Sequence, residues 1–200
     1  MSSKLRVLCL HGYTQTAQKF RERTGPFRRS LKNDLDFYFI TAPHVATEFD
    51  SGNAWWNRVP DSDPRRIWME VQASLDLISR VVREEGPFDG ILGFSQGAGM
   101  AAIAMAMLPE MRMGFAILVA GFMPDMKEFT SSIERSRISV PALVVVGEKD
   151  EIVPAIRGKL LAQEAFTQGS VTVLTHEGGH FLPCNAMWRT HYRDFLNNNK

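Results

Sequence analysis

A serine flanked by glycines carries the clearest chemistry in this chain. Residues 93–97 read Gly-Phe-Ser-Gln-Gly, a G-x-S-x-G pentapeptide centred on Ser95. An apolar run at 88–92 precedes it, and a helix-like stretch at 98–108 follows it. Strand, sharp turn and helix in this order hold a serine Oγ outward at the edge of a sheet, and the glycines let the two elements pass close together. The pattern predicts a nucleophilic serine, but it also occurs in ordinary turns, so the rest of the chain must supply its partners.

A serine hydroxyl needs a neighbouring base to take its proton before it attacks. Of the five histidines, His180 is the predicted base because it follows Gly178 and Gly179 in a loop that can turn the ring back over Ser95. His176 is the alternative, but it lies closer to the end of an apolar run at 171–175 and is expected to pack there.

The base in turn needs a carboxylate to hold its tautomer. Asp150 is preferred because it lies a few residues beyond the apolar run 142–146 and is followed by a helix start at Val153 and Pro154. The chain order is then Ser, acid, His, which is the order found in α/β-hydrolases. The competing carboxylates are Asp125, Glu148 and Glu151.

Backbone N–H groups must stabilise the oxyanion that forms when a serine attacks a carbonyl. Gln96 is predicted to supply one of them from the first turn of the helix after Ser95, where the helix dipole also favours negative charge. Tyr13 is predicted to supply the second from the loop after the apolar run 5–10, and its neighbour His11 is expected to be structural.

Short apolar runs alternate with helical patterns along most of the chain. The expected strands are 5–10, 37–41, 88–92, 115–120, 142–146 and 171–175, and the expected helices are 15–31, 65–83, 96–107, 155–166 and 185–196. This alternation predicts an α/β fold with a mainly parallel sheet covered by helices on both faces, in which ligands bind beyond the carboxyl ends of the strands. Residues 1–200 are expected to form a single domain, and the short polar segment before residue 142 leaves no room for a large lid.

Composition excludes several other classes of protein. The 200 residues are 44% hydrophobic, and 23 basic residues balance 22 acidic ones, so no nucleic-acid surface is expected. No apolar stretch reaches the length of a membrane span. Two cysteines, Cys9 and Cys184, make no disulfide framework. We expect a location in the cytoplasm, with the nucleus as the second compartment, and a site that uses neither a cofactor nor a metal.

Two motifs imitate other functions. Residues 176–180 read His-Glu-Gly-Gly-His, which matches the H-E-x-x-H signature of zinc hydrolases. That signature requires a helix, whereas two glycines lie inside the motif, a β-branched run precedes it and Pro183 follows it. Gly97, Gly99 and Ala102 fit a dinucleotide fingerprint, but no acid follows about 20 residues later to hold a ribose.

Aromatic residues near the predicted site indicate an apolar substrate. Residues 43–64 form a long connection that contains Trp55 and Trp56, and we expect at least one indole to line the entrance, although both could instead pack the loop onto the core. Phe94, Phe122 and Phe181 lie near predicted strand ends, and no charged recognition cluster is apparent. The expected substrate is a small ester or thioester whose acyl chain enters the pocket. A non-catalytic binding protein with the same fold is the remaining alternative.

Several of these residues together resemble the FSH-type serine hydrolases of the α/β-hydrolase superfamily, a group that includes the ovarian-cancer-associated esterase of animals. The resemblance runs through 10–12 with Gln15, 42–43, 54–56, 93–98, 147–150 with 153–154, and 178–180 with Pro183. It implies a serine hydrolase whose nucleophile, acid and base are Ser95, Asp150 and His180. The chain departs from the family pattern at Thr16 and Ala17, where Asn and Gly are frequent, and at Glu177, where Pro is frequent.

Overall fold

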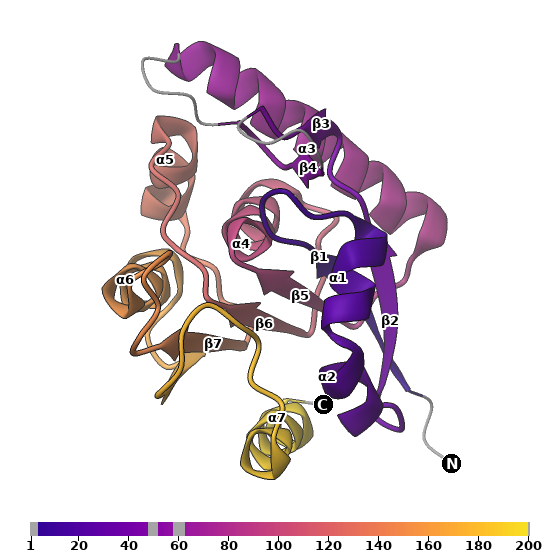
Figure 1. Ribbon diagram of the computed structural model, residues 1–200. Coiled ribbons are helices and arrows are strands. Elements are labelled where there is room, and N and C mark those ends of the chain that lie inside the picture. The colour runs from indigo at the N-terminus through magenta and orange to yellow at the C-terminus, as the bar shows by residue number, and fades with distance from the viewer. Residues whose placement is uncertain (1–3, 48–51, 58–62, 200) are drawn as a thin grey trace.

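A six-stranded parallel sheet forms the centre of the molecule (Figure 1). The computed structural model describes residues 4–47, 52–57 and 63–199. The strand order is β2-β1-β5-β6-β7-β8, and every neighbouring pair is parallel. The strands are β1 (Leu5–Leu10), β2 (Leu35–Ile40), β5 (Gly90–Phe94), β6 (Phe115–Val119), β7 (Ala142–Gly147) and β8 (Val171–His176). A separate antiparallel pair joins β3 (His44–Val45) to β4 (Asn53–Ala54).

Within the described residues, seven helices cover the sheet and divide the core into two layers. They are α1 (Ala17–Arg23), α2 (Gly25–Ser30), α3 (Pro64–Glu85), α4 (Gln96–Met107), α5 (Lys127–Arg135), α6 (Ala155–Ala165) and α7 (Ala186–Asn198). Apolar residues of α3, α4, α5 and α6 pack on one face of the sheet, and those of α1, α2 and α7 pack on the other. Figure 1 shows α4 and α7 on opposite sides of the sheet. Because both faces are covered, the inner strands β5, β6 and β7 are buried along their whole length and read as continuous apolar runs.

The structure confirms the six predicted strands and the parallel sheet, with shifts of up to two residues at their ends. The largest shift is in β5, which begins at Gly90 and continues to Phe94, so it leads directly into Ser95. The predicted helix 15–31 is two helices that meet at Thr24. Pro26 explains the break, because its ring lacks an N–H and crowds the preceding turn. Both the backbone N–H and the hydroxyl of Thr24 donate to the Phe20 carbonyl, at 3.0 and 2.7 Å, and so cap the end of α1.

One helix, α5, is absent from the sequence prediction. Its buried residues Phe129, Ser132 and Ile133 are spaced to share one helix face, which packs with α4. The polar residues around them obscured this pattern. Residues 120–141, all within the described part, contain no other helix or strand, so no large lid lies between β6 and β7. Among the described helices, none combines the length and the apolar character needed to cross a bilayer.

Helix α4 approaches the sheet closely because its first turns carry small residues. A Cβ on Gly97 would lie 2.2 Å from the Leu10 carbonyl oxygen and 2.5 Å from that of His11. Gly121, beyond β6, passes Ala98 so closely that a Cβ there would lie 2.7 Å from the alanine Cβ. By contrast, a Cβ on Gly99 would lie 3.4 Å or more from its neighbours, at ordinary contact distance.

These contacts predict opposite effects for two neighbouring glycines. Gly97→Ala should lower the free energy of unfolding by about 2–3 kcal/mol, because the new methyl group meets the β1 backbone. Gly99→Ala should leave it unchanged or raise it by about 0.5–1 kcal/mol, because alanine is the better helix former. Urea unfolding of the two variants measures both effects, and equal losses would contradict the close approach at Gly97.

Candidate active site

Ser95 lies at the sharp turn between β5 and α4, where the backbone is strained. Its φ of 54° and ψ of −120° are unusual for a residue with a side chain. The turn is held by backbone hydrogen bonds, because the Ser95 N–H donates to the Val119 carbonyl at 2.9 Å and the Ser95 carbonyl accepts from the Ala98 N–H at 2.9 Å. Ser95 is 8% exposed and lines a cavity of about 570 Å³. This geometry presents the hydroxyl to a pocket at the carboxyl edge of the sheet.

The glycine before the serine is as necessary as the one after it. A Cβ on Gly93 would lie 2.5 Å from both the Ala98 Cα and the Gly97 carbonyl oxygen. Any side chain at this position would push α4 away from β5. The two glycines of the pentapeptide therefore serve different contacts, Gly93 toward α4 and Gly97 toward β1.

His180 forms a hydrogen bond with a buried carboxylate. Its Nδ1 lies 2.7 Å from Asp150 Oδ2, and the Asp150 side chain is completely buried. The other carboxylate oxygen, Oδ1, accepts from the backbone N–H groups of Ile152 at 3.0 Å and Val153 at 2.8 Å. Because a carboxylate only accepts, Nδ1 carries the hydrogen, and Nε2 is left as the basic nitrogen. Of the competing acids, Asp125, Glu148 and Glu151 are all exposed.

Backbone contacts between two loops bring this pair together. β7 and β8 run in parallel with Gly147 opposite His176, so the loops that follow them start side by side. The Glu148 N–H then donates to the His176 carbonyl at 2.8 Å, and the Lys149 N–H donates to the Gly178 carbonyl at 3.0 Å. These backbone bonds hold the loop that carries Asp150 against the loop that carries His180, independently of the side chains.

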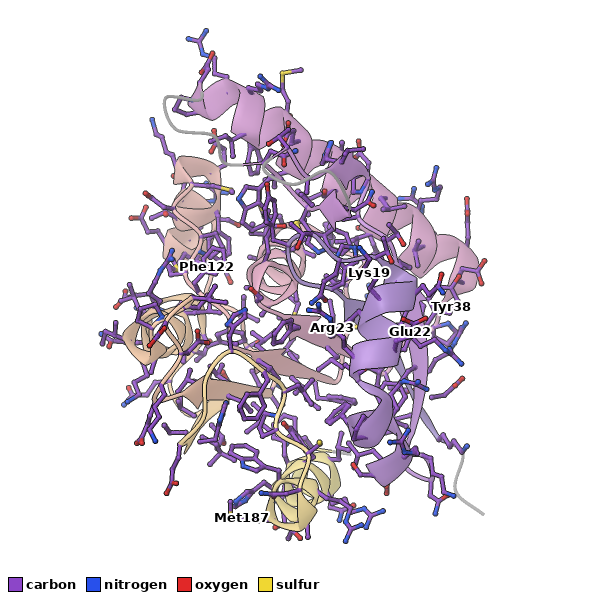
Figure 2. The ribbon with its side chains drawn as sticks, viewed as in Figure 1. Lys19, Glu22, Arg23, Tyr38, Phe122 and Met187 are labelled. Atoms are coloured by element: carbon purple, nitrogen blue, oxygen red, sulfur yellow. The ribbon has the colours of Figure 1, made fainter. Side chains whose placement is uncertain are left out.

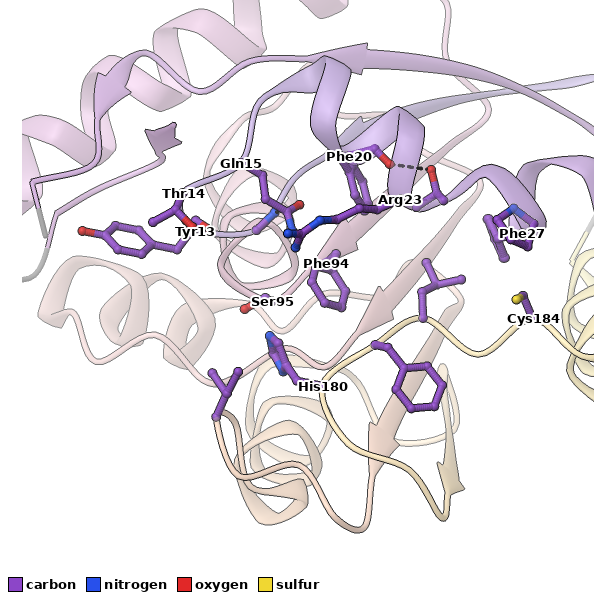
Figure 3. A pocket seen from close by; sticks show the side chains of 16 residues that line it. Tyr13, Thr14, Gln15, Phe20, Arg23, Phe27, Phe94, Ser95, His180 and Cys184 are labelled. Atoms are coloured by element: carbon purple, nitrogen blue, oxygen red, sulfur yellow. Dashed lines mark hydrogen bonds between the residues drawn. The ribbon is translucent and has the colours of Figure 1, made fainter. Parts of the chain in front are cut away.

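Ser95 and His180 line the same cavity, as Figure 3 shows. The His180 ring also packs on Phe94, the residue before the serine, with ring centroids 5.0 Å apart. The structure thus gathers the predicted nucleophile and the predicted base at one pocket and connects the base to the predicted acid.

The two predicted oxyanion donors lie beside Ser95. Gln96 is the first residue of α4, where a backbone N–H has no acceptor within its own helix. Both polar atoms of its buried side chain are hydrogen-bonded, since Oε1 accepts from the Trp55 backbone N–H at 3.0 Å and Nε2 donates to the Trp56 carbonyl at 2.6 Å. Tyr13 lines the cavity from the loop after β1, and its hydroxyl donates to Asn57 Oδ1 at 3.2 Å.

Comparison with known proteins identifies the family. The sequence profile described as "Serine hydrolase (FSH1)" matches residues 1–192. The chain is 36% identical to Esterase OVCA2 of Danio rerio, with 96% of each chain covered, and 34% identical to Esterase OVCA2 of Homo sapiens, with 96% of this chain and 95% of the relative covered. The chain belongs to the FSH1 serine hydrolase family.

Solved structures share the fold of this FSH1 family member. Esterase PE8 superimposes with a TM-score of 0.77 at 21% identity, covering 100% of this chain and 94% of its own. Acyl-protein thioesterase 2 of Zea mays superimposes with a TM-score of 0.72 at 18% identity, covering 98% and 95%. The predicted α/β-hydrolase fold is therefore confirmed.

Both tryptophans of the loop after β4 are buried in the core of the FSH1 protein. Trp55 is 0% exposed and Trp56 is 4% exposed, and neither lines the cavity beside Ser95. The Trp55 Nε1–H donates to the His11 carbonyl at 2.8 Å, so this indole supports the loop that follows β1. Both indoles therefore pack in the core, and neither lines the entrance to the cavity as the sequence predicted. Of the predicted connection 43–64, residues 48–51 and 58–62 lie outside the described part.

The three phenylalanines predicted to bind substrate divide between two places. Phe94 and Phe181 line the cavity, but Phe122 does not. Phe122 instead packs on Trp56, with ring centroids 6.1 Å apart, and under the Arg157 guanidinium at 4.7 Å. Figure 2 shows Phe122 on the side of α5 and α6, away from α1.

The sequence prediction missed the wall that α1 and α2 give to the cavity. Phe20, Arg23 and Phe27 line it, together with Thr24 and Pro26 between them. The usable signal was the position of these helices directly after the β1 loop, at the same edge of the sheet as Ser95.

The zinc-like motif has the geometry of a loop. His176 ends β8, and residues 177–181 are not helical, so the two histidines do not share a helix face. The His176 ring packs between Phe181 and Trp188, its Nδ1 accepts from the Gly178 N–H at 3.2 Å, and burial lowers its pKa. Within residues 4–47, 52–57 and 63–199, no three His, Cys, Asp or Glu side chains gather as a metal site would require.

His11 is structural and must stay neutral. It is 0% exposed, its Nδ1 donates to the Gly12 carbonyl at 2.7 Å, and its Nε2 accepts from the Ala42 N–H at 2.9 Å. Burial lowers the pKa of His11 from 6.5 to about 4. A second proton would place one N–H against another.

This depressed pKa predicts a specific acid sensitivity. Between pH 6.5 and about 4, His11 binds a proton in the unfolded chain and stays neutral in the folded protein. The free energy of unfolding therefore falls as the pH falls through this range. The contribution is about 3 kcal/mol in total, at about 1.4 kcal/mol per pH unit. In His11→Gln, unfolding in urea at pH 7 and pH 4 should show a smaller difference than in the unmodified protein. Equal differences in the two proteins would contradict this assignment.

Proposed function

We propose that this chain is a carboxylic-ester hydrolase that works through an acyl-enzyme, with Ser95 as nucleophile, His180 as general base and Asp150 as its orienting acid. The observation that carries the proposal is the hydrogen bond between His180 and the buried Asp150, at the cavity that also receives the strained Ser95. The curated relatives named esterases agree with this reaction class.

In the first half of the proposed reaction, His180 Nε2 takes the Ser95 proton as Oγ attacks the ester carbonyl carbon. The tetrahedral oxyanion accepts hydrogen bonds from the backbone N–H groups of Gln96 and Tyr13. Collapse of this intermediate breaks the bond to the alcohol, which receives the proton from His180. Asp150 stays ionised throughout and stabilises the imidazolium.

In the second half, water replaces the alcohol. His180 takes a proton from water as the water oxygen attacks the acyl-enzyme carbonyl, and a second tetrahedral intermediate forms at the same donors. Its collapse releases the carboxylic acid and returns the proton to Ser95 Oγ. No group outside the protein and water is needed for the balance.

The acyl chain is proposed to lie in the cavity of about 570 Å³. This volume is in the usual range for small-molecule sites, and aromatic side chains form much of the wall. A thioester passes through the same acyl-enzyme and is the second candidate substrate.

Cys9 and Cys184 are both free thiols, which agrees with the cytoplasmic location that we propose.

The assignment of the nucleophile and the acid can be tested together. A fluorophosphonate probe should label the unmodified protein at Ser95, and Ser95→Ala should abolish both labelling and ester hydrolysis. Asp150→Asn should lower kcat by roughly ten-thousand-fold, because the wrong histidine tautomer then faces the serine.

Matched controls come from the same loop. Glu148→Gln and Glu151→Gln remove equal charge at exposed positions and should leave kcat within about two-fold of the unmodified value. Labelling that persists in Ser95→Ala, or an Asp150→Asn variant as active as these controls, would refute the assignment.

A substrate series tests the acyl pocket. With p-nitrophenyl esters, kcat/KM should rise with each added methylene until the chain fills the cavity, by up to about four-fold per step, since a buried methylene contributes about 0.8 kcal/mol. Coenzyme A thioesters of the same acids separate ester from thioester preference. Negligible rates across both series would argue against an acyl pocket.

A further inference from the structure

The cavity wall that α1 contributes carries one positive charge in otherwise uncharged or apolar surroundings. Among the described residues that line the cavity, Arg23 is the one lysine or arginine, and none is aspartate or glutamate. In Figure 3 the Arg23 side chain reaches from α1 into the cavity, on the side where Ser95 and His180 lie.

Arg23 has no partner in the described part of the chain. No hydrogen bond or ion pair involves its guanidinium there, whereas Arg28 donates to the Arg21 carbonyl at 3.1 Å and Arg193 pairs with Asp34 at 3.1 Å. The nearest acid in sequence, Glu22, accepts instead from Gln18 Nε2 at 3.0 Å. The cavity therefore faces a guanidinium whose charge no described side chain neutralises.

The surrounding helices strengthen the positive field at this wall. Residues 17–33, which include α1 and α2, hold six lysines or arginines and one glutamate, a local excess of five positive charges in a chain whose net charge is +1. Figure 2 shows Lys19, Glu22 and Arg23 together at α1. Such a concentration of one sign beside a pocket attracts an oppositely charged ligand.

The position of Arg23 fits a group at a distance from the reacting carbonyl. Phe20 stacks on Phe94 with ring centroids 6.0 Å apart, and Phe94 is the residue before Ser95. Arg23 follows Phe20 by three residues, so it lies on the same side of α1, about one helical turn further along. A substrate that reaches from Ser95 past Phe20 would bring its far end to the guanidinium.

From these observations we infer that Arg23 binds an anionic group, a carboxylate or a phosphate, on the substrate. This inference rests on the proposed ester or thioester hydrolysis and narrows its substrate class. The anion belongs either to the acyl chain, as in the monoester of a dicarboxylic acid, or to the leaving group, as in a thioester of a phosphorylated thiol. In both, the planar guanidinium donates charge-assisted hydrogen bonds to oxygen, and the aromatic wall covers the apolar segment between.

Two pairs of substrates test the two sources of the anion. On the acyl side, monomethyl adipate is compared with its neutral amide, methyl adipamate. On the leaving-group side, hexanoyl coenzyme A is compared with hexanoyl pantetheine, which lacks the phosphates. The measured quantity is the ratio of kcat/KM between the anionic and the neutral member of each pair.

In the unmodified protein at least one ratio should favour the anionic substrate by about 10- to 100-fold, and Arg23→Gln should bring that ratio close to one. Arg23→Lys should retain part of it, because the charge remains but the fork geometry is lost. Arg21→Gln is the matched control, since it removes the same charge from an exposed arginine of α1 that does not line the cavity, and it should keep the unmodified ratio.

Ratios near one in both pairs, or an anion preference that survives Arg23→Gln, would overturn the inference. Fluorophosphonate labelling of Ser95 in the same preparations separates this failure from a failure of the proposed function. If labelling and neutral-ester hydrolysis persist without anion preference, only the role of Arg23 is refuted. If neither Ser95 labelling nor hydrolysis of any substrate occurs, the hydrolase proposal itself is refuted.

Discussion

The close passage of α4 over β1 and β5 is the constraint on which the rest of the site depends. The chain reverses direction at Ser95, directly between strand β5 and helix α4, and this sharp turn gives Ser95 its positive φ. The turn can be this tight because Gly93 and Gly97 place no side chains between α4 and the strands. The reversal also sets the first N–H of α4 beside the serine. One packing condition thus positions the hydroxyl and a backbone donor together.

A second condition acts across the sheet, where β7 and β8 deliver the acid and the imidazole. Their register places Gly147 opposite His176, and the backbone bonds beyond this point align the two loops. Both carboxylate oxygens of Asp150 accept hydrogen bonds, one from His180 and the other from backbone N–H groups of its own loop. Hydrogen bonds to both oxygens compensate the burial of this carboxylate.

Much of this arrangement was predictable because local rules and the parallel fold agree. Each predicted apolar run is a strand, and the residues that follow parallel strands gather at one edge of the sheet. The sequence alone could therefore indicate that Ser95, Asp150 and His180 lie near one another. The tryptophans show where such reasoning ends. An indole in a long loop can face the pocket or the core. The Trp55 indole faces the core, where its Nε1–H donates to the carbonyl of His11, 44 residues away. Likewise, the apolar face of α5 is recognised from its contact with α4. The place of Arg23 at the cavity is recognised once the side of α1 that faces the cavity is known.

The imidazole that we propose as the base lies just beyond β8, which among the described strands is an edge strand of the sheet and pairs with β7 alone. Border strands with partly exposed side chains are among the first parts of a protein to open, at a smaller free-energy cost than the central strands. Gentle heating could therefore release this histidine from the aspartate while the remaining sheet stays folded. Inactivation and global denaturation would then be separate events in this enzyme.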